Sequence, residues 1–175
     1  MKMINLAYQF DLISPIFKRG KQTLIVIKDK ADNFILGSKK WYPQNIYRFV
    51  GGGIEEGEEI FSGTYREFEE ELGLDFHKDK LKQIAKIQID ISNSKEKYLY
   101  EVYLFFYQAS GEKFKALDDL DDLKILTYKE MKQLIQEFYS LKEDLFGEEE
   151  HQLFRWKDYG AVFGKIHEIA LDLIC

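Results

Sequence analysis

The chain has 175 residues, of which 45% are hydrophobic and 32% are charged. This balance excludes a disordered tail and a membrane protein, and 14 phenylalanines and 11 tyrosines can fill a sizeable core. The net charge of −6 argues against general binding of nucleic acid or an anionic membrane, because both need a basic surface.

The N-terminus lacks the uninterrupted apolar stretch of a secretory signal. The most apolar later stretch, residues 98–107, is far shorter than the roughly 20 residues that a membrane helix requires. The single cysteine, Cys175, cannot form an intrachain disulfide. We therefore expect a cytoplasmic protein. Against a prior of roughly 150 residues per domain, we expect residues 1–175 to form a single domain.

The first predicted element is a β-hairpin. Residues 23–28 (TLIVIK) are a β-branched run, residues 29–33 (DKADN) are typical of a turn, and apolar residues resume at 34–36. Residues 37–45 are predicted to form a loop, and residues 46–50 a short strand that ends at three consecutive glycines.

A helix is predicted over residues 58–72. Gly73 is a suitable C-cap, whereas Gly63 is a weak position, because glycine costs about 1 kcal/mol relative to alanine inside a helix. Four apolar residues recur at helical spacing and should dock on the sheet: Phe61, Tyr65, Phe68 and Leu72.

The second half of the chain predicts a second hairpin and two more helices. Strand-like runs at residues 81–91 and 98–107 are joined by a polar turn, and an acidic loop at 118–122 precedes a short strand at 123–126. The helices are expected over about residues 128–138 and 154–174. Together these elements predict a mixed α/β (α+β) domain with a C-terminal helix.

The acidic residues are concentrated around the first predicted helix. Eight glutamates and one arginine lie between residues 55 and 71, so this segment carries the acidic excess of the chain. At about 100° per residue, Glu67, Glu70 and Glu71 share roughly 100° of arc beside the apolar side. Their repulsion favours a hard cation such as Mg²⁺, which prefers oxygen ligands. Gly63 lies one turn earlier, and its missing side chain would leave room for a ligand or a metal-bound water.

The simpler alternative is that this glutamate-rich helix is only a solvated surface, as charge runs usually are. The preceding glycines favour a site instead. A glycine-rich turn exposes backbone N–H and carbonyl groups beside the carboxylates, and this arrangement suits a metal–phosphate unit.

Residues 52–74 (GGIEEGEEIFSGTYREFEEELGL) resemble the Nudix box, the signature of the Nudix hydrolase family. The match has no gap, and its fixed positions are Gly52, Glu58, Arg66, Glu67, Phe68, Glu70, Glu71, Gly73 and Leu74. The resemblance implies the Nudix fold, an α/β/α sandwich around a mixed β-sheet. It also implies a pyrophosphohydrolase that uses Mg²⁺ or Mn²⁺.

The resemblance implies roles for individual residues. Arg66 would orient a box glutamate, which we take to be Glu58, rather than touch the substrate. A carboxylate would accept a proton from a metal-activated water, and either Glu67 or Glu70 could do so. Val50 and Gly63 depart from the usual proline and alanine but remove no ligand. The implied metal ligands are the Gly51 carbonyl and the carboxylates of Glu67, Glu70 and Glu71.

The implied substrate is a small nucleoside diphosphate derivative. A nucleoside triphosphate is the first choice, and a nucleotide sugar or ADP-ribose is the alternative. A different class of function also stays open, namely a non-catalytic module that senses a nucleotide or binds a partner. A homodimer is one assembly that the chain could form.

Outside the box, two groups of residues are candidates for the site. One aspartate of residues 118–122 (Asp118, Asp119, Asp121 or Asp122) could add a carboxylate, or the segment is a solvated turn. The run at residues 148–150 is expected to face solvent. Four residues that precede the box could contact phosphate or stack on a base, although surface lysines and core aromatics are the commoner reading: Lys39, Lys40, Trp41 and Arg48.

Overall fold

Helices cover both faces of a mixed β-sheet. The computed structural model describes residues 1–73 and 77–175, so Leu74 of the box lies outside the described residues. Within this range, six strands form one sheet in the order β1-β4-β5-β2-β3-β6, and β7 pairs with β8 separately. The strands are β1 (Lys2–Gln9), β2 (Lys21–Lys28), β3 (Phe34–Lys39), β4 (Lys82–Ser92), β5 (Lys97–Gln108), β6 (Leu120–Leu126), β7 (Phe146–Glu149) and β8 (Gln152–Arg155). The helices are α1 (Pro15–Lys18), α2 (Ile60–Leu72), the 3₁₀ turn η1 (Lys78–Lys80), α3 (Tyr128–Tyr139) and α4 (Trp156–Ile174).

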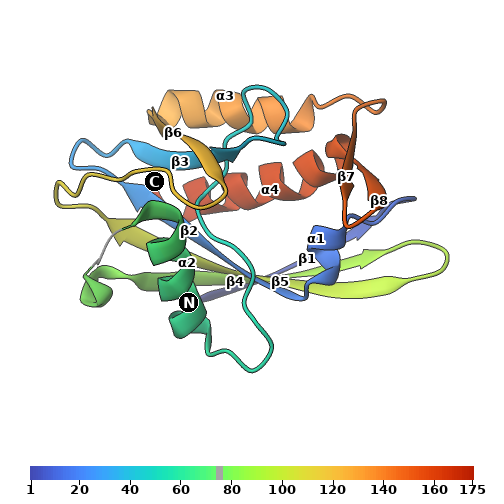
Figure 1. Cartoon of the computed structure of the whole chain (residues 1–175), viewed down its shortest axis with the longest axis horizontal. Helices are drawn as coiled ribbons and strands as arrows, with labels where there is room; N and C mark the ends of the chain where they lie inside the picture. The colour runs from blue at the N-terminus through green and yellow to red at the C-terminus, as the bar shows by residue number, and fades with distance from the viewer. Residues whose placement is uncertain (74–76) are drawn as a thin grey trace.

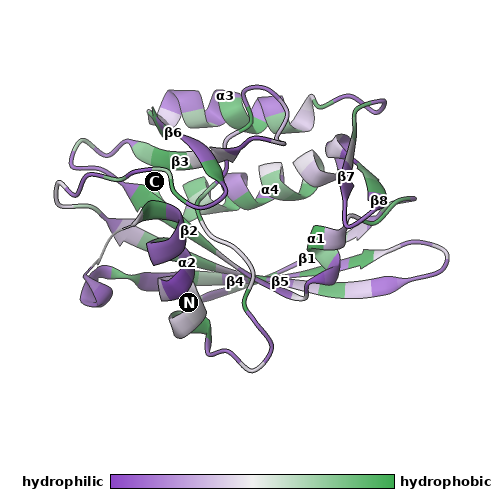
Figure 2. Cartoon of the chain, in the orientation of Figure 1, coloured by the Kyte–Doolittle hydropathy of each residue, from purple (hydrophilic) through white to green (hydrophobic). Residues whose placement is uncertain are grey.

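The sheet separates two hydrophobic cores. On β2, Leu24 and Val26 belong to the core beneath α3 and α4, whereas Ile25 and Ile27 belong to the core beneath α2, because successive side chains of a strand face opposite sides. The strands run between α2 and α4 in Figure 1. Figure 2 shows green, apolar bands along the strands, whereas much of α2 is purple. The predicted α/β/α sandwich is therefore confirmed.

The segment that leads into the box lies in a gap between two strands. Strands β2 and β3 pair only at Ile27–Ile35 and Lys28–Phe34, and then they diverge. Residues 46–53, which we call the linking segment, lie in this gap. They form isolated bridges to both strands, at Gly37–Arg48, Ile25–Val50 and Gln22–Gly53. The predicted strand at 46–50 was therefore wrong, because the segment alternates between two partners instead of following one.

Several predicted boundaries need correction. Strand β3 continues to Lys39, so the predicted loop starts too early. Helix α2 begins at Ile60 instead of residue 58, because the Glu59 side chain caps it by accepting a hydrogen bond from the Ser62 N–H at 3.2 Å. The predicted C-cap is confirmed, since Gly73 adopts a left-handed φ of 65°.

The later elements also differ from the sequence prediction. Strand β6 begins at Leu120, so Asp121 and Asp122 lie in a strand rather than in a loop. Helix α4 begins at Trp156 instead of residue 154, because the preceding residues pair with β7. The hairpin β4–β5 and the helix α3 are confirmed. Within the described parts of the chain, none of the helices combines the length and apolarity of a membrane span.

Helix α4 anchors the C-terminal part of the chain in the larger core. Phe163 is fully buried and stacks on Tyr159, with ring centroids 4.2 Å apart. Replacing Phe163 with alanine should lower the free energy of unfolding by about 3–5 kcal/mol, because the change removes buried apolar surface and leaves a cavity. Chemical denaturation measures this loss. The matched change of Phe146, which is 47% exposed, should cost far less, and equal losses would contradict the anchoring role.

A buried histidine ties α4 to the linking segment. The Phe49 N–H donates to His167 Nε2 at 3.2 Å, and His167 Nδ1 donates to the Phe163 carbonyl at 2.7 Å. Burial lowers the pKa of His167 to about 3 from the ordinary value of 6.5. Below pH 6.5 the His167 side chain binds a proton in the unfolded chain but stays neutral in the folded chain. The free energy of unfolding should therefore decrease as the pH falls.

This loss gives a testable pH dependence. Between about pH 6.5 and pH 4, His167 should contribute a slope of up to about 1.4 kcal/mol per pH unit to the free energy of unfolding. Comparing the unfolding free energies of wild type and His167→Gln across this range measures the slope. His151→Gln is the matched control, because the side chain of His151 is fully exposed. An unchanged slope in His167→Gln would contradict the assignment.

Candidate active site

The linking segment brings two glycines against the carboxylates of α2. The Gly51 N–H donates to Glu71 Oε2 at 2.7 Å. A Cβ at Gly51, whose φ is 132°, would lie 2.3 Å from the Thr23 carbonyl oxygen. A Cβ at Gly52 would lie 2.2 Å from Glu67 Oε2. Gly51 therefore needs to be glycine, because a side chain there would clash with the backbone of β2 at a φ that favours glycine. At Gly52 a side chain would displace the Glu67 carboxylate.

Arg66 organises the exposed side of this region. Its Nε and Nη2 donate to the two Glu58 oxygens at 3.0 and 2.9 Å, so the predicted pairing of Arg66 with Glu58 is confirmed. Its Nη1 donates to Glu67 Oε1 at 2.8 Å and to Glu70 Oε2 at 3.1 Å. Its Nη2 also donates to the Gly53 carbonyl at 3.0 Å. One guanidinium therefore holds three carboxylates and the linking segment in fixed positions.

The three predicted metal ligands on α2 differ strongly in exposure. The side chain of Glu71 is 2% exposed, that of Glu67 is 13% exposed and that of Glu70 is 48% exposed. Burial raises the pKa of Glu71 to about 7, and burial also raises the pKa of Glu67. The three carboxylates of α2 therefore range from the exposed Glu70 to the buried Glu71. Ionising the two more buried ones, Glu67 and Glu71, costs free energy unless a cation lies nearby.

Lys39 connects this region to the acidic segment before β6. Its Nζ lies 3.5 Å from Glu71 Oε1 and donates to Asp119 Oδ2. Of the four candidate aspartates, Asp119 is thus the one that is linked, through Lys39, to a predicted metal ligand. Asp122 instead accepts a hydrogen bond from the Tyr47 hydroxyl at 2.7 Å, and Asp118 and Asp121 are exposed.

Gly63 does not provide the space that the sequence suggested. A Cβ at this position would lie 2.6 Å from Ile54 Cδ1 and 2.7 Å from Glu58 Oε2. The space is filled by protein atoms, so the expectation of room for a ligand or water was wrong. The absent side chain instead allows residues 54–58 to pack closely on α2, which places Glu58 within reach of Arg66.

The other candidates before the box play different parts. Arg48 is 4% exposed, and its Nη2 donates to the Gly51 carbonyl at 2.9 Å while its Nη1 donates to the Tyr159 hydroxyl at 3.2 Å. It therefore supports the linking segment. Trp41 is 57% exposed and Lys40 is also exposed. The contact from Tyr159 was missed, and no local pattern could predict it, because the two residues are 111 positions apart.

The residues of this region fit a divalent cation by their chemistry. Carboxylate oxygens of Glu67, Glu70 and Glu71 and a backbone carbonyl are the hard donors that Mg²⁺ and Mn²⁺ prefer. Within residues 1–73 and 77–175, no group of three or more His, Cys, Asp or Glu side chains already converges on a metal position. Arg66 instead holds Glu67 and Glu70 in the structure.

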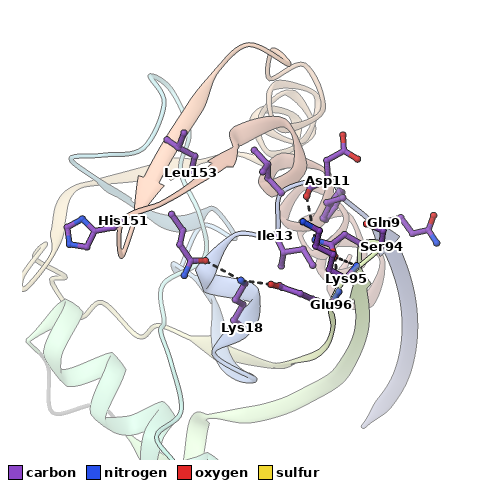
Figure 3. A pocket seen from close by; sticks show the side chains of 13 residues that line it. Gln9, Asp11, Ile13, Lys18, Ser94, Lys95, Glu96, His151 and Leu153 are labelled. Atoms are coloured by element: carbon purple, nitrogen blue, oxygen red, sulfur yellow. Dashed lines mark hydrogen bonds and ion pairs between the residues drawn. The ribbon is translucent and has the colours of Figure 1, made fainter.

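A separate hollow is shown in Figure 3. It has a volume of about 1120 Å³ and is lined by residues around α1, the β4–β5 turn and the β7–β8 hairpin. Lys18 crosses it, with its Nζ 3.2 Å from both Glu96 Oε2 and Gln152 Oε1 (Figure 3). None of the predicted site residues lines this hollow.

Comparison with known proteins identifies the fold and the domain. The family model of the NUDIX domain matches residues 13–146. No curated protein sequence gives a significant match.

Several solved structures share the fold at low identity. A Nudix hydrolase from M. smegmatis, RenU, is 12% identical with a TM-score of 0.56, covering 90% of this chain and 89% of that one. The E. coli dihydroneopterin triphosphate pyrophosphohydrolase is 18% identical with a TM-score of 0.53, covering 69% and 87%. A bifunctional NMN adenylyltransferase/ADP ribose pyrophosphatase from Francisella tularensis, complexed with AMP and a Mn ion, is 16% identical with a TM-score of 0.53. That match covers 89% of this chain but only 43% of the Francisella chain.

Proposed function

The chain belongs to the Nudix family of pyrophosphohydrolases, and on that premise we propose that it hydrolyses a pyrophosphate bond in a nucleoside triphosphate or another nucleoside diphosphate derivative. One observation carries the proposal. The glycines of the linking segment contact Glu67 and Glu71 closely, while Arg66 holds Glu58, Glu67 and Glu70 beside them. The names of two similar structures agree with this substrate class, since one acts on dihydroneopterin triphosphate and another on ADP-ribose.

The proposed cofactor is Mg²⁺ or Mn²⁺. Glu67, Glu70, Glu71 and the Gly51 carbonyl would hold it, and the Mn ion in the Francisella structure supports this choice. When bound, such an ion neutralises phosphate charge and lowers the pKa of a coordinated water. The raised pKa values of the buried Glu67 and Glu71 support the assignment, because an adjacent cation would relieve the cost of ionising both groups.

The chain's own residues supply positioning and a proton acceptor. Arg66 would orient Glu58 and Glu67 through charge-assisted hydrogen bonds without touching the substrate. Glu67 or Glu70 would accept the proton from the attacking water. Glu67 is the better placed of the two, because it is more buried, and burial raises its pKa, the direction that general-base catalysis favours for a carboxylate.

A substrate panel tests the proposed function. Purified protein is incubated with nucleoside triphosphates, ADP-ribose and nucleotide sugars in the presence of Mg²⁺ or Mn²⁺, and both products are identified. We expect metal-dependent release of a nucleoside monophosphate. The second product should be pyrophosphate from a nucleoside triphosphate, and a sugar phosphate from ADP-ribose or a nucleotide sugar. No product from any compound with either metal would contradict the enzyme and favour a non-catalytic binding module.

We also propose that residues 1–175 act as one domain. Strand β1 pairs in parallel with β4, and α4 packs in the same core as Leu24 and Val26 of the central strands. Both ends of the chain therefore contribute to one core, which lies on the face of the sheet opposite α2. We expect denaturant unfolding followed by fluorescence and by circular dichroism to give coincident single transitions. Separated transitions would contradict a single domain.

A further inference from the structure

The backbone of Gly51 is held by hydrogen bonds at both its N–H and its carbonyl. The N–H donates to Glu71 Oε2 at 2.7 Å, and the carbonyl accepts from Arg48 Nη2 at 2.9 Å. Gly51 has a φ of 132°, and glycine leaves the backbone more conformational freedom than any other residue. The two hydrogen bonds therefore fix the direction of a carbonyl that the backbone alone would leave free to turn.

Arg48 makes this contact from a buried position. It is only 4% exposed, and its guanidinium carbon lies 4.9 Å from the centroid of the Phe163 ring and 5.9 Å from that of Tyr42. Removing a charged group from water costs free energy, so a buried arginine is expected where its donors are used. The planar guanidinium can direct two N–H groups at two oxygens at once. Here these oxygens are the Gly51 carbonyl and the Tyr159 hydroxyl.

Tyr159 holds the guanidinium from helix α4. Its hydroxyl accepts a hydrogen bond from Arg48 Nη1 at 3.2 Å and donates to the Tyr42 hydroxyl at 3.3 Å. The Tyr159 side chain is itself buried, and its ring stacks on that of Phe163 with the centroids 4.2 Å apart. This packing restricts the position of the hydroxyl. Tyr159 therefore gives Arg48 a fixed partner on the side away from Gly51.

Helix α4 contacts the linking segment at a second point. The Phe49 N–H donates to His167 Nε2 at 3.2 Å, so two consecutive residues of the segment, Arg48 and Phe49, are bonded to α4. The family match ends at residue 146, whereas α4 runs from Trp156 to Ile174. The support for the Gly51 peptide therefore comes from a part of the chain that the family match does not include.

These contacts lead from α4 to two of the proposed metal ligands, the Gly51 carbonyl and Glu71. A carbonyl oxygen has two lone pairs, so the hydrogen bond from Arg48 leaves one lone pair for a cation. Groups that orient a metal ligand without touching the metal typically change metal affinity or activity by about 10–100-fold. Arg48 has the position of such a group, and Tyr159 stands one hydrogen bond behind it.

We propose that Arg48 and Tyr159 are positioning residues for the metal site, through which α4 sets the affinity for the divalent cation. Tyr159 fixes the guanidinium of Arg48. Arg48 then fixes the Gly51 carbonyl and, through the N–H of the same residue, the carboxylate of Glu71. This inference rests on the proposed function, because the Gly51 carbonyl and Glu71 are ligands of the proposed cofactor.

Binding of Mn²⁺ tests this inference without any turnover. Electron paramagnetic resonance measures the free hydrated ion, whose sharp lines weaken as the protein binds it. Wild type, Arg48→Lys and Tyr159→Phe are titrated with and without a non-hydrolysable nucleotide, and circular dichroism checks their folding. Both variants keep the positive charge at position 48, so a change in affinity reports the lost hydrogen bonds rather than a change in charge.

Arg48→Lys should raise the dissociation constant for Mn²⁺ by about 10–100-fold, because an ammonium group cannot hold both oxygens in a fixed direction. Tyr159→Phe keeps the buried ring and removes only the hydroxyl, so the increase should be about 3–10-fold. Tyr42→Phe is the matched control. It removes the neighbouring hydroxyl but leaves the hydrogen bond between Arg48 and Tyr159, and its dissociation constant should equal that of wild type.

The double variant Arg48→Lys/Tyr159→Phe tests whether Tyr159 acts through Arg48. Once the guanidinium is lost, removing the Tyr159 hydroxyl should weaken Mn²⁺ binding no further, so the double variant should match Arg48→Lys within about twofold. Two independent structural effects would instead multiply. Excess Mn²⁺ should also restore kcat of both single variants to within about threefold of wild type, because the ligands themselves remain.

The outcomes separate this inference from the proposed function. Unchanged Mn²⁺ affinity in Arg48→Lys and Tyr159→Phe would overturn the inference and leave the enzyme standing. Tighter binding by either variant would mean that Arg48 competes with the cation for the carbonyl, and it would overturn the inference as well. Weaker binding by both variants, without hydrolysis of any compound by wild type, would support the inference and contradict the enzyme. No Mn²⁺ binding by wild type would overturn both.

Discussion

Replacing Glu67 with glutamine should lower kcat for nucleotide hydrolysis by roughly 10²–10⁴-fold while the protein remains folded. The amide keeps the size of the side chain and can still accept the Arg66 hydrogen bond at Oε1. It removes the negative charge that would hold the cation and the basic oxygen that would accept the proton of water. Steady-state kinetics at saturating Mg²⁺ measure the loss, and circular dichroism checks the fold.

Glu69→Gln is the matched control for this change. Glu69 lies on the same helix, two residues along the chain, but its side chain is exposed and points away from the linking segment. Its variant should keep kcat within about twofold. A similar loss in both variants would indicate that the general charge of α2 matters rather than the position of Glu67. Full activity in Glu67→Gln would remove Glu67 from the mechanism.

Replacing Arg66 with lysine should lower kcat/KM by about 10–100-fold and raise the metal concentration that gives half-maximal activity. Lysine keeps the positive charge, but it cannot donate to both Glu58 oxygens, to Glu67, to Glu70 and to the Gly53 carbonyl together. The carboxylates would remain present yet lose their fixed positions. Titrating activity with Mn²⁺ separates this positioning effect from a loss of folding.

Arg155→Lys provides the comparison for Arg66→Lys. Arg155 pairs with Asp11 on the surface, at 3.2 Å, and it contacts none of the box residues in the described structure. The activity and metal dependence of this variant should equal those of wild type. If Arg66→Lys also keeps the activity and the metal dependence of wild type, then the hydrogen bonds of Arg66 only stabilise the surface of α2. The positioning role of Arg66 would then be wrong.

The helix of the box could be predicted because its signals are local. Phe68 and Leu72 recur at helical spacing and are buried as expected, and Gly73 ends the helix in the left-handed conformation. The pairing of Arg66 with Glu58 was also predicted, since both belong to one continuous motif. These features depend on neighbours within a few residues, which the sequence records directly.

Features that depend on distant parts of the chain could not be predicted in this way. Residues 46–50 looked like a strand, but the divergence of β2 from β3 lets them form only one bridge to each strand. Gly63 looked like an opening, but Ile54 fills its space from a loop whose path the sequence does not show. The role of Asp119 likewise depends on Lys39, which is 80 positions away.

Strand β1 was missed although a local signal was present. Ile4, Leu6 and Tyr8 alternate with exposed residues, and this period of two is typical of a half-buried edge strand. Its partner β4 is more than 70 residues away in the chain, so the parallel pairing could not be predicted from the local pattern. The β7–β8 hairpin was also missed. Its glutamates were expected to be only a solvated run, although Glu149 pairs with Arg19, which is 130 positions away.

Titration calorimetry with Mg²⁺ and Mn²⁺ tests most directly whether the carboxylates of α2 hold a divalent cation. The titration is made with and without a non-hydrolysable nucleotide, on wild type, on Glu67→Gln/Glu70→Gln and on Glu69→Gln. Saturable uptake by wild type and Glu69→Gln that disappears in the double variant is the predicted result. No uptake by any of them, or equal uptake by all three, would contradict the site.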